Sequence, residues 1–237
     1  MAYSERGLAA GGNARPIVSP TSDEGWTDYA RSPRVKTNRY EPHQVVFYEG
    51  DQADRIYELL EGAVMLYKLL PDGRRQVVEV LGANDMFGLL ASRAYDCNAE
   101  TLTPCVIRVL DRKDAETTPA AQRHITRCLL AQMESMHEHA VLLGRKSAFE
   151  RVSSFLMRFV PGRGIADCRG PAGAGRDDAL IVLTMTRQEI ADYLGLTIET
   201  VSRVISDLKR RGLIAIEKQD RIRINNVCGM CHQTGAH

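Results

Sequence analysis

The 237-residue chain lacks any long hydrophobic run and any excess of charge of one sign. Its 31 lysines and arginines are balanced by 30 aspartates and glutamates, which leaves a formal net charge of +1. No apolar stretch approaches the about 20 residues that a membrane-spanning helix requires. The first residues also lack the charged start and apolar stretch of a secretory signal. We therefore expect a cytoplasmic protein without a membrane span, and one that presents no broad basic field to a nucleic acid.

The chain also lacks the residue patterns of common enzymes. No paired carboxylates, no nucleophile beside a base and no phosphate-cradling loop stand out, so we do not expect an enzyme. A hydrophobic content of 44% is sufficient for packed cores, and the length allows one large or two small domains. Residues 1–35 are rich in Gly, Ala, Ser, Pro and charge, which predicts a disordered N-terminal tail.

The segment 183–203 has the pattern of two helices joined by a tight turn. Thr186 is a candidate N-cap, and Glu189 follows at the position that completes a capping box. Gly195 can adopt a positive φ and so end the first helix. Thr197 is the next candidate N-cap, so a second helix is expected over about 198–211.

Polar and apolar residues of this second helix separate onto opposite faces. The expected apolar stripe consists of Val201, Val204, Ile205 and Leu208. Opposite the stripe, Arg203 can pair with a guanine edge, Glu199 can accept a hydrogen bond from a cytosine amine, and Ser202 is small enough for close approach. An ordinary amphipathic helix with a solvated face is the alternative. The helix before it and a short β-hairpin over 213–224 favour a winged helix-turn-helix that reads DNA bases.

The stretch from Thr186 to Arg203 resembles the helix-turn-helix of the CRP/FNR family of bacterial transcription regulators, and in particular its FNR and FixK branches. The resemblance covers roughly residues 36–226. It implies a homodimer that binds double-stranded DNA at TTGA…TCAA-like palindromes and contacts RNA polymerase. The base-reading residues that it implies are Ile198, Glu199, Ser202 and Arg203. The implied phosphate contacts, which position the protein without reading sequence, are Thr186, Arg187 and Gln188.

Upstream of this segment, short β-strand patterns separated by glycines run from Gln44 to about Leu110. The resemblance makes this region the β-roll of the cyclic-nucleotide-binding fold. Cyclic-AMP readers of the family carry Gly-Glu and an Arg-Ser pair for the phosphate, whereas Gly88 here precedes Leu89 and the Arg-Ser position falls near Cys97-Asn98. Without the arginine a buried phosphodiester loses its strongest partner, so we expect no bound cyclic nucleotide.

A long helix is expected over residues 119–145, where Pro119 suits the first turn. Its apolar residues follow a spacing close to a heptad repeat. In the family this is the dimer helix, and a palindromic site requires a two-fold dimer. The predicted dimer seam consists of Ile125, Leu129, Met133, Met136, Ala140 and Leu143.

The expected fold is therefore α+β. A β-roll over 36–118 is followed by a dimerisation helix over 119–145, a winged helix-turn-helix domain over 146–226 and a flexible tail over 227–237. The last domain is expected to begin with a helix from Ala148 to Val160, followed by a loop rich in glycine and proline.

The cysteines further restrict the family branch. None precedes Cys97, so the N-terminal cysteine group that holds the iron–sulfur cluster of FNR is absent, and the matching β-roll position is Arg108. This difference favours the FixK branch, whose members lack the cluster and act on respiration and nitrogen-fixation genes under low oxygen. We expect no cofactor. A ligand- or redox-gated regulator of the same fold is the alternative, with Cys168 a possible redox residue because it lies between Asp167 and Arg169.

The C-terminus spells Cys228-Gly-Met-Cys-His232, the attachment pattern of c-type haem. Haem attachment takes place outside the cytoplasm, which disfavours it here. A metal site formed by Cys228, Cys231, His232 and His237 is another alternative. A flexible tail with reduced thiols is favoured over both, so we expect no metal.

Overall fold

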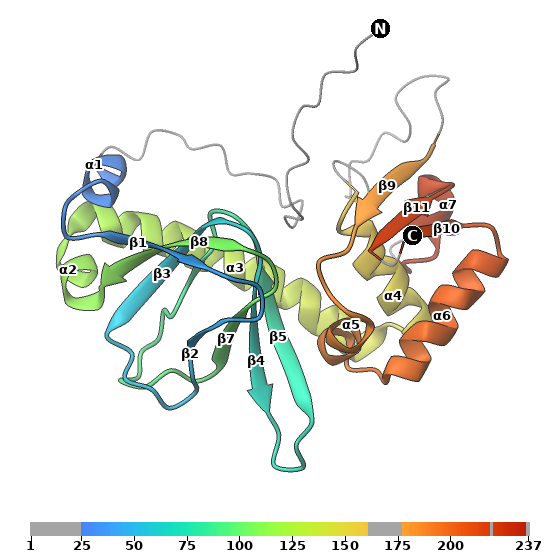
Figure 1. Cartoon of the computed structure of the whole chain (residues 1–237), viewed down its shortest axis with the longest axis horizontal. Helices are drawn as coiled ribbons and strands as arrows, with labels where there is room; N and C mark the ends of the chain where they lie inside the picture. Colours follow the sequence, from blue (N-terminus) through green and yellow to red (C-terminus); the bar gives the residue numbers. More distant parts are fainter. Residues whose placement is uncertain (1–24, 161–176, 219, 236–237) are drawn as a thin grey trace, which may run out of the picture.

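A long helix, α3 (Pro119–Arg145), joins a β-rich body to a mainly helical one (Figure 1). The computed structural model describes residues 25–160, 177–218 and 220–235. The sheets and helices confirm the expected α+β class, with the β-roll before α3 and the helix-turn-helix after it. None of the described helices is long and apolar enough to cross a bilayer.

Two antiparallel four-stranded sheets form the β-roll (Figure 1). The first sheet, in spatial order, consists of β1 (Lys36–Tyr40), β8 (Cys105–Asp111), β3 (Arg55–Glu61) and β6 (Met86–Phe87). The second consists of β2 (Val45–Phe47), β7 (Asn98–Thr101), β4 (Val64–Leu69) and β5 (Arg75–Leu81). The predicted strand-rich region is confirmed, and it also includes β1, which precedes the first expected strand.

Turn chemistry explains where these strands reverse. Gly62 joins β3 to β4 with φ +97°, and a Cβ at this position would lie 2.4 Å from the Pro104 carbonyl oxygen. A side chain cannot be accommodated at that distance, so only glycine permits the tight connection. The β4–β5 hairpin turns at Pro71-Asp72-Gly73, where Gly73 has φ +84°.

Aromatic rings occupy the core between the two sheets. Phe47 stacks on Tyr95 with ring centroids 3.8 Å apart, and Tyr57 stacks on Phe87 at 5.1 Å. Phe47 also lies 5.4 Å from Tyr57, so the four rings form one cluster. All four side chains are buried. Ring stacking and burial of this area together hold the sheets face to face.

The start of the structured region corrects the predicted tail. Residues 1–24 lie outside the described residues, but residues 25–35 are ordered and include helix α1 (Trp26–Ala30). Trp26 is buried, and its ring stacks on His124 of α3 at 3.9 Å. Helix α2 (Arg112–Thr117) then connects β8 to α3. The compositional argument for disorder was wrong for 25–35 because one buried tryptophan contributes enough apolar area to hold a short helix.

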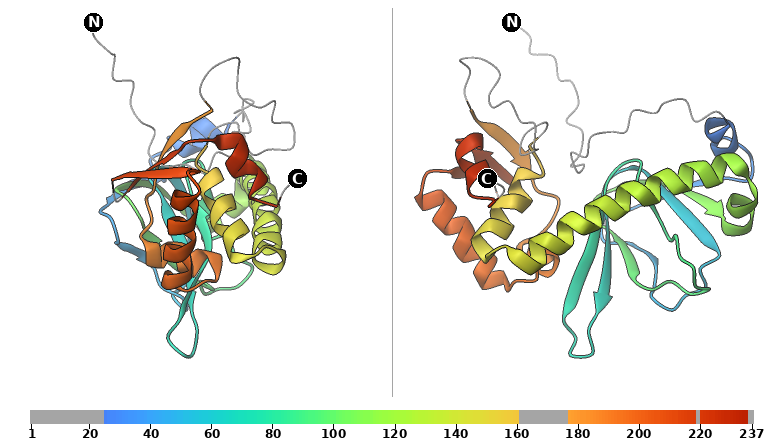
Figure 2. Two further views of the ribbon diagram at one scale, coloured as in Figure 1. Left: turned by 90° about the vertical axis from the view of Figure 1, so that its right-hand side faces the viewer. Right: turned by 180° about the vertical axis from the view of Figure 1, so that it is seen from behind.

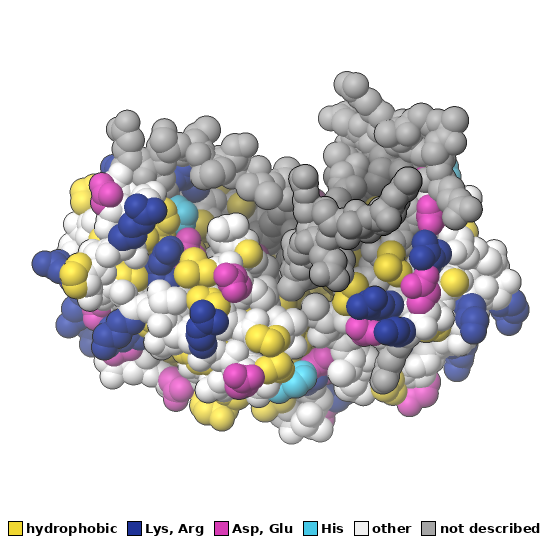
Figure 3. All heavy atoms as spheres, turned by 45° about the horizontal axis from the view of Figure 1, so that its top comes forward, with side chains coloured by type: hydrophobic (Ala, Val, Ile, Leu, Met, Phe, Trp, Pro, Cys, Tyr) yellow, Lys and Arg dark blue, Asp and Glu magenta, His cyan; other side chains and the backbone are white. Residues whose placement is uncertain are grey.

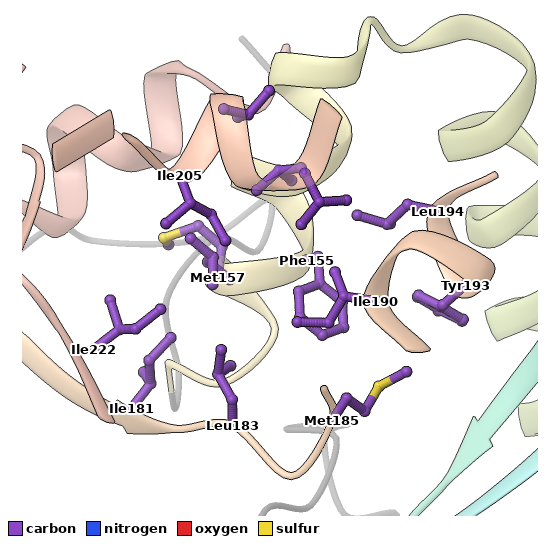
Figure 4. Close-up of a cluster of buried hydrophobic side chains, with 14 of the residues drawn as sticks. Phe155, Met157, Ile181, Leu183, Met185, Ile190, Tyr193, Leu194, Ile205 and Ile222 are labelled. Atoms are coloured by element: carbon purple, nitrogen blue, oxygen red, sulfur yellow. The ribbon is translucent and has the colours of Figure 1, made fainter. Parts of the chain in front are cut away.

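The C-terminal body packs its helices and a small sheet around one core. It contains α4 (Ala148–Met157), α5 (Arg187–Leu194), α6 (Ile198–Arg210) and a sheet of β9 (Ala179–Val182), β11 (Arg221–Ile224) and β10 (Ile214–Lys218). Figure 4 shows side chains from α4, α5, α6 and the strands meeting in one core, with Phe155, Ile190 and Ile205 among them. Helix α4 ends three residues earlier than expected. The predicted loop and Cys168 fall within 161–176, outside the described residues.

The C-terminal segment corrects a second boundary. Residues 227–232 form helix α7 (Val227–His232) rather than a flexible tail. Val227 and Met230 are buried against α4, and Asn226 caps the helix by accepting a hydrogen bond from the Gly229 amide at 2.6 Å. The Cys-Gly-Met-Cys-His sequence is thus part of a helix that two apolar residues, Val227 and Met230, hold against the domain. No group of three His, Cys, Asp or Glu side chains suited to a metal occurs in 25–160, 177–218 and 220–235.

Candidate nucleic-acid interface

Helix α5 begins and ends as its sequence predicts. The Glu189 amide donates to Thr186 Oγ1 at 3.2 Å, and the Thr186 amide donates to Glu189 Oε2 at 2.7 Å. This reciprocal pair is a complete capping box. Gly195 follows the last turn with φ +60° and ends the helix in the left-handed conformation. The first helix of the motif is therefore fixed by local chemistry.

The second helix, α6, is anchored by one face. Thr197 caps it by accepting from the Thr200 amide at 3.3 Å. The expected apolar stripe is confirmed, and all four of its residues are buried: Val201, Val204, Ile205 and Leu208. Burying four aliphatic side chains contributes several kcal/mol at about 1.5–3 kcal/mol each, which is sufficient to hold the helix while its opposite face stays uncovered.

The proposed base-reading residues all lie on that uncovered face. Glu199, Ser202 and Arg203 are exposed within the first two turns of α6, and Ile198 is 36% exposed beside them. The backbone amide of Glu199, the Thr197 hydroxyl and the Arg203 charge lower the pKa of the Glu199 carboxyl. It is therefore an ionised acceptor at neutral pH, which a cytosine amine requires.

The proposed phosphate contacts gather at the N-terminus of α5, where backbone amides and the helix dipole favour an anion. Thr186 and Gln188 are exposed, but both side chains already have partners: Thr186 in the capping box and Gln188 with Asp192 Oδ1 at 2.7 Å. Arg187 is half-buried, and burial lowers its pKa. Its buried Nη1 has no hydrogen-bond partner among the described residues. The three residues lie together, and their phosphate role stays a prediction.

Charge on the molecular surface is mixed rather than concentrated. Figure 3 shows basic and acidic side chains interspersed on the face in view. This agrees with the near-neutral composition. The face in view therefore presents no large basic field.

The position expected to match the phosphate-gripping Arg-Ser pair of a cyclic-AMP reader holds Cys97 and Asn98. Cys97 is buried, and burial raises the pKa of its thiol to about 12, so it is neutral. Asn98 is buried too, accepting from the Glu49 amide at 3.1 Å and donating to the Tyr67 carbonyl at 3.3 Å. These contacts agree with the expectation that no cyclic nucleotide binds, which stays a prediction.

The position that matches the β-roll cysteine of FNR holds an ion pair. Arg108 donates to the buried carboxylate of Glu58, and His124 of α3 lies 3.5 Å from the other oxygen of that carboxylate. The Trp26 ring covers His124. This site is therefore filled by a charge network that holds α1, β3, β8 and α3 together.

The face of α3 turned away from the β-roll is apolar and uncovered. Leu129, Met133 and Met136 are 43%, 48% and 59% exposed, and Ala140 is exposed between them and the helix end. Figure 2 shows this helix from behind, with its outer side uncovered along most of its length. The seam stays a prediction, and the residues at its two ends, Ile125 and Leu143, are partly buried. Ile125 packs on the core beneath α1, and Leu143 packs on the core of the C-terminal body.

Two exposed residues of α3 belong to this face but were missed by the sequence pattern. They are Leu130, 53% exposed, and Val141, 56% exposed. The heptad pattern follows one apolar stripe along α3, and Leu130 and Val141 lie beside that stripe on the same uncovered side. A strict heptad spacing selects one narrow stripe, so it leaves out apolar residues that widen the exposed face.

Comparison with known proteins agrees with this geometry. Residues 37–119 match the model of the cyclic nucleotide-binding domain, and residues 183–214 match that of the bacterial regulatory proteins of the crp family. The chain is 37% identical over 185 residues to the nitrogen fixation regulation protein FixK of Rhizobium meliloti (strain 1021), with 78% of this chain and 81% of that protein covered.

A second relative and a solved structure extend the likeness. The transcriptional activator protein FnrL of Cereibacter sphaeroides (strain ATCC 17023) is 33% identical over 200 residues, covering 83% of this chain and 79% of that protein. The structure of FixK2 from Bradyrhizobium japonicum superposes with a TM-score of 0.71 and 29% identity, covering 86% of this chain and 98% of the other. On the strength of its sequence, its β-roll and its exposed reading helix, the chain belongs to the CRP/FNR family of DNA-binding transcription regulators and is a FixK-like member of it.

Proposed function

We propose that the protein is a homodimeric, cytoplasmic transcription activator of low-oxygen respiration or nitrogen-fixation genes that binds TTGA…TCAA-like palindromes and RNA polymerase. The observation that carries the DNA-reading part is the first half of α6. There an acidic, a hydroxyl and a guanidinium side chain, from Glu199, Ser202 and Arg203, lie exposed on one face while the opposite face is buried. This is the arrangement of a recognition helix whose N-terminal residues enter the major groove.

The assignments within the site follow from hydrogen-bonding capacity. Arg203 has two parallel donors for the O6 and N7 acceptors of guanine, and Glu199 is an acceptor for the amine of the paired cytosine. Ser202 lies beside both and allows close approach near a thymine. Ile198 supplies an apolar contact for a thymine methyl group. Together they account for one half-site.

The homodimer rests on the uncovered stripe of α3. A lone helix that exposes Leu129, Met133 and Met136 along one side leaves an apolar patch that soluble monomers seldom present. A second copy of the same helix covers it through a two-fold axis, and the same axis matches a palindromic DNA site. The methionines make this interface adaptable in packing.

The physiological role rests on the relatives. The Rhizobium protein named for nitrogen fixation regulation and the activator FnrL both align over more than three quarters of this chain. Activation in low oxygen, without an iron–sulfur cluster of its own, is the role that this likeness supports best.

The test is a mobility-shift titration of purified protein, without additives, on a duplex that carries the TTGA…TCAA palindrome. A second duplex with both half-sites scrambled is the control. We expect tight binding to the palindrome and a markedly weaker shift on the scrambled duplex at the same salt concentration. Equal binding to both duplexes would contradict the base-reading assignment. Binding that requires a small molecule or a change of redox state would favour a gated regulator instead.

A further inference from the structure

Helix α5, the first helix of the helix-turn-helix, contacts the β-roll as well as its own domain, the winged helix-turn-helix domain (below, the reader). Helix α5 lies against β5, beside the crossing with α3 (Figure 1). Arg75 Nε, at the start of β5, donates to Asp192 Oδ2 of α5 at 2.7 Å. The two side chains are 24% and 9% exposed. A carboxylate buried to this extent requires a cation or strong donors beside it, so this ion pair is a defined link between the two bodies.

The same carboxylate also accepts a hydrogen bond from Gln188, one of the proposed phosphate contacts. Asp192 Oδ1 accepts from Gln188 Nε2 at 2.7 Å, one helical turn away. One carboxylate oxygen of Asp192 therefore contacts the β-roll, and the other contacts the N-terminal part of α5. On its own side Arg75 is held in place because its guanidinium lies 5.4 Å from the centre of the Tyr67 ring on β4.

A second contact joins the same turn of α5 to the β-roll. His43 Nδ1, between β1 and β2, lies 3.7 Å from Glu189 Oε1 and 3.4 Å from Glu100 Oε1 on β7. Glu189 is the capping glutamate of α5. The start of the helix-turn-helix thus meets the β-roll at two points, and rotation of α5 about either contact alone is restricted.

We propose that Arg75 is a positioning residue for palindrome recognition, which fixes α5, and with it α6, relative to the β-roll through Asp192. The inference rests on the proposed homodimer and its palindromic site. Two recognition helices must lie about 34–36 Å apart to enter successive turns of the same groove. That separation depends on the position and orientation of each winged helix-turn-helix domain relative to the β-roll and α3. Without the Arg75–Asp192 ion pair, each recognition helix still recognises its half-site, but the distance between the two recognition helices is no longer fixed.

The experiment compares Arg75→Gln with Arg74→Gln in the full-length protein. Both substitutions remove one positive charge from the β4–β5 hairpin. Arg74 is 76% exposed and pairs only with Asp72 of the turn among the described residues, at 2.7 Å, so it is a matched control. Affinity is measured on the full palindrome, on a duplex with a single half-site, and on palindromes whose spacer is lengthened or shortened by single base pairs.

Arg75→Gln should weaken binding to the palindrome by about 5–150-fold, the usual range for coupling between sites, and leave binding to the single half-site unchanged. Its dependence on spacer length should also be flatter than that of the parent. Arg74→Gln should match the parent on every duplex. Asp192→Asn and the Arg75→Gln/Asp192→Asn double variant should complete a cycle in which the second substitution adds little to the first.

Two results would overturn the proposal. One is the same palindrome-to-half-site ratio and the same spacer profile for Arg75→Gln as for Arg74→Gln. The other is an equal loss on half-site and palindrome, which would assign the ion pair to stability of the reader alone. If Arg75→Gln does not fold, Arg75→Lys keeps the charge without the guanidinium geometry and should show an intermediate loss on the palindrome. A parent protein that does not prefer the palindrome would contradict the proposed function instead.

Discussion

In the β-roll, aromatic rings fill the space between the sheets, whereas in the winged helix domain the second helix leaves its polar face uncovered. The rings of Phe47, Tyr57 and Tyr95 contact one another in the interior of the β-roll. By contrast, Glu199 and Arg203 have solvent in front of them and a buried apolar stripe behind. The same chain therefore uses one body mainly as a packed scaffold and the other as a reading surface.

The packed interior of the β-roll suits it to a scaffolding role. A β-roll whose interior is packed is rigid, and a rigid body can set the position of whatever is attached to it. Here two parts are attached, the long helix α3 and, through Arg75 and Asp192, the first helix of the reader. Substitutions at the link, in the scaffold and in the reader should consequently have different effects.

The largest effect is expected from disrupting the proposed dimer interface on α3. Leu129→Glu with Met136→Glu places charges on the uncovered stripe of α3, where a partner helix would have to bury them. We expect monomers in light scattering and a loss of palindrome affinity of about 10²–10⁴-fold, because two readers no longer bind together.

Leu180→Glu is the control for that double substitution. Leu180 is 44% exposed on β9, in the reader and away from α3, so the same change of chemistry there should leave the dimer intact. A double variant that remains dimeric would show that the stripe is not the seam.

A loss of stability is expected when a buried ring is removed from the core of the β-roll. Phe47→Ala removes a buried ring that contacts three others and should lower the free energy of unfolding by about 3–5 kcal/mol. Thermal or denaturant unfolding measures the loss. Tyr48→Ala, next in sequence but 57% exposed, should cost about 0.5 kcal/mol or less. A Phe47→Ala protein as stable as the parent would mean that the space between the two sheets of the β-roll is not a packed core.

The reader should respond through specificity rather than stability. Arg203→Ala should lose about 1–3 kcal/mol per half-site and relax the preference at the guanine. Arg210→Ala, 81% exposed in the last turn and paired with Asp207, is the matched control and should keep that preference. Quantitative mobility shifts on single-base variants of the palindrome check both. An unchanged base preference in Arg203→Ala would remove Arg203 from base reading.

The smallest effect is expected where the two bodies meet. His139 of α3 stacks on Tyr193 of α5 at 4.3 Å, and burial, together with the Arg158 charge, lowers its pKa to about 4. Its pKa in the unfolded chain is about 6.5, so the unfolded state binds the proton first as pH falls. The stabilising contribution is therefore complete above about pH 6.5 and is lost as pH falls toward 4.

His139→Phe keeps a ring against Tyr193 and removes the titration. Between pH 6.5 and 4 it should lose about 1–2 kcal/mol less stability than the parent. The two pKa values alone correspond to about 3 kcal/mol, and solvent screening of this partly exposed ring reduces that figure. His232→Phe, at an exposed site on α7, should keep the pH dependence of the parent. Identical acid unfolding of the parent and His139→Phe would show that His139 is not held neutral.

Local signals determined the helix-turn-helix. Thr186 with Glu189, Gly195 and Thr197 specify where α5 and α6 begin and end because caps and turns depend on neighbours within a few residues. The alternation of apolar and polar residues in α6 also separated its anchored face from its reading face. The strands of the β-roll were likewise marked by their turns.

Only the tertiary structure decided which residues distant in sequence contact one another. It ordered residues 25–35 through Trp26, and packed Ile125 and Leu143 partly against two cores while leaving Leu130 and Val141 exposed. It also joined Arg75 to Asp192 across 117 positions. A period in the sequence shows that a helix has an apolar face, but which neighbour covers that face depends on contacts that no local pattern contains.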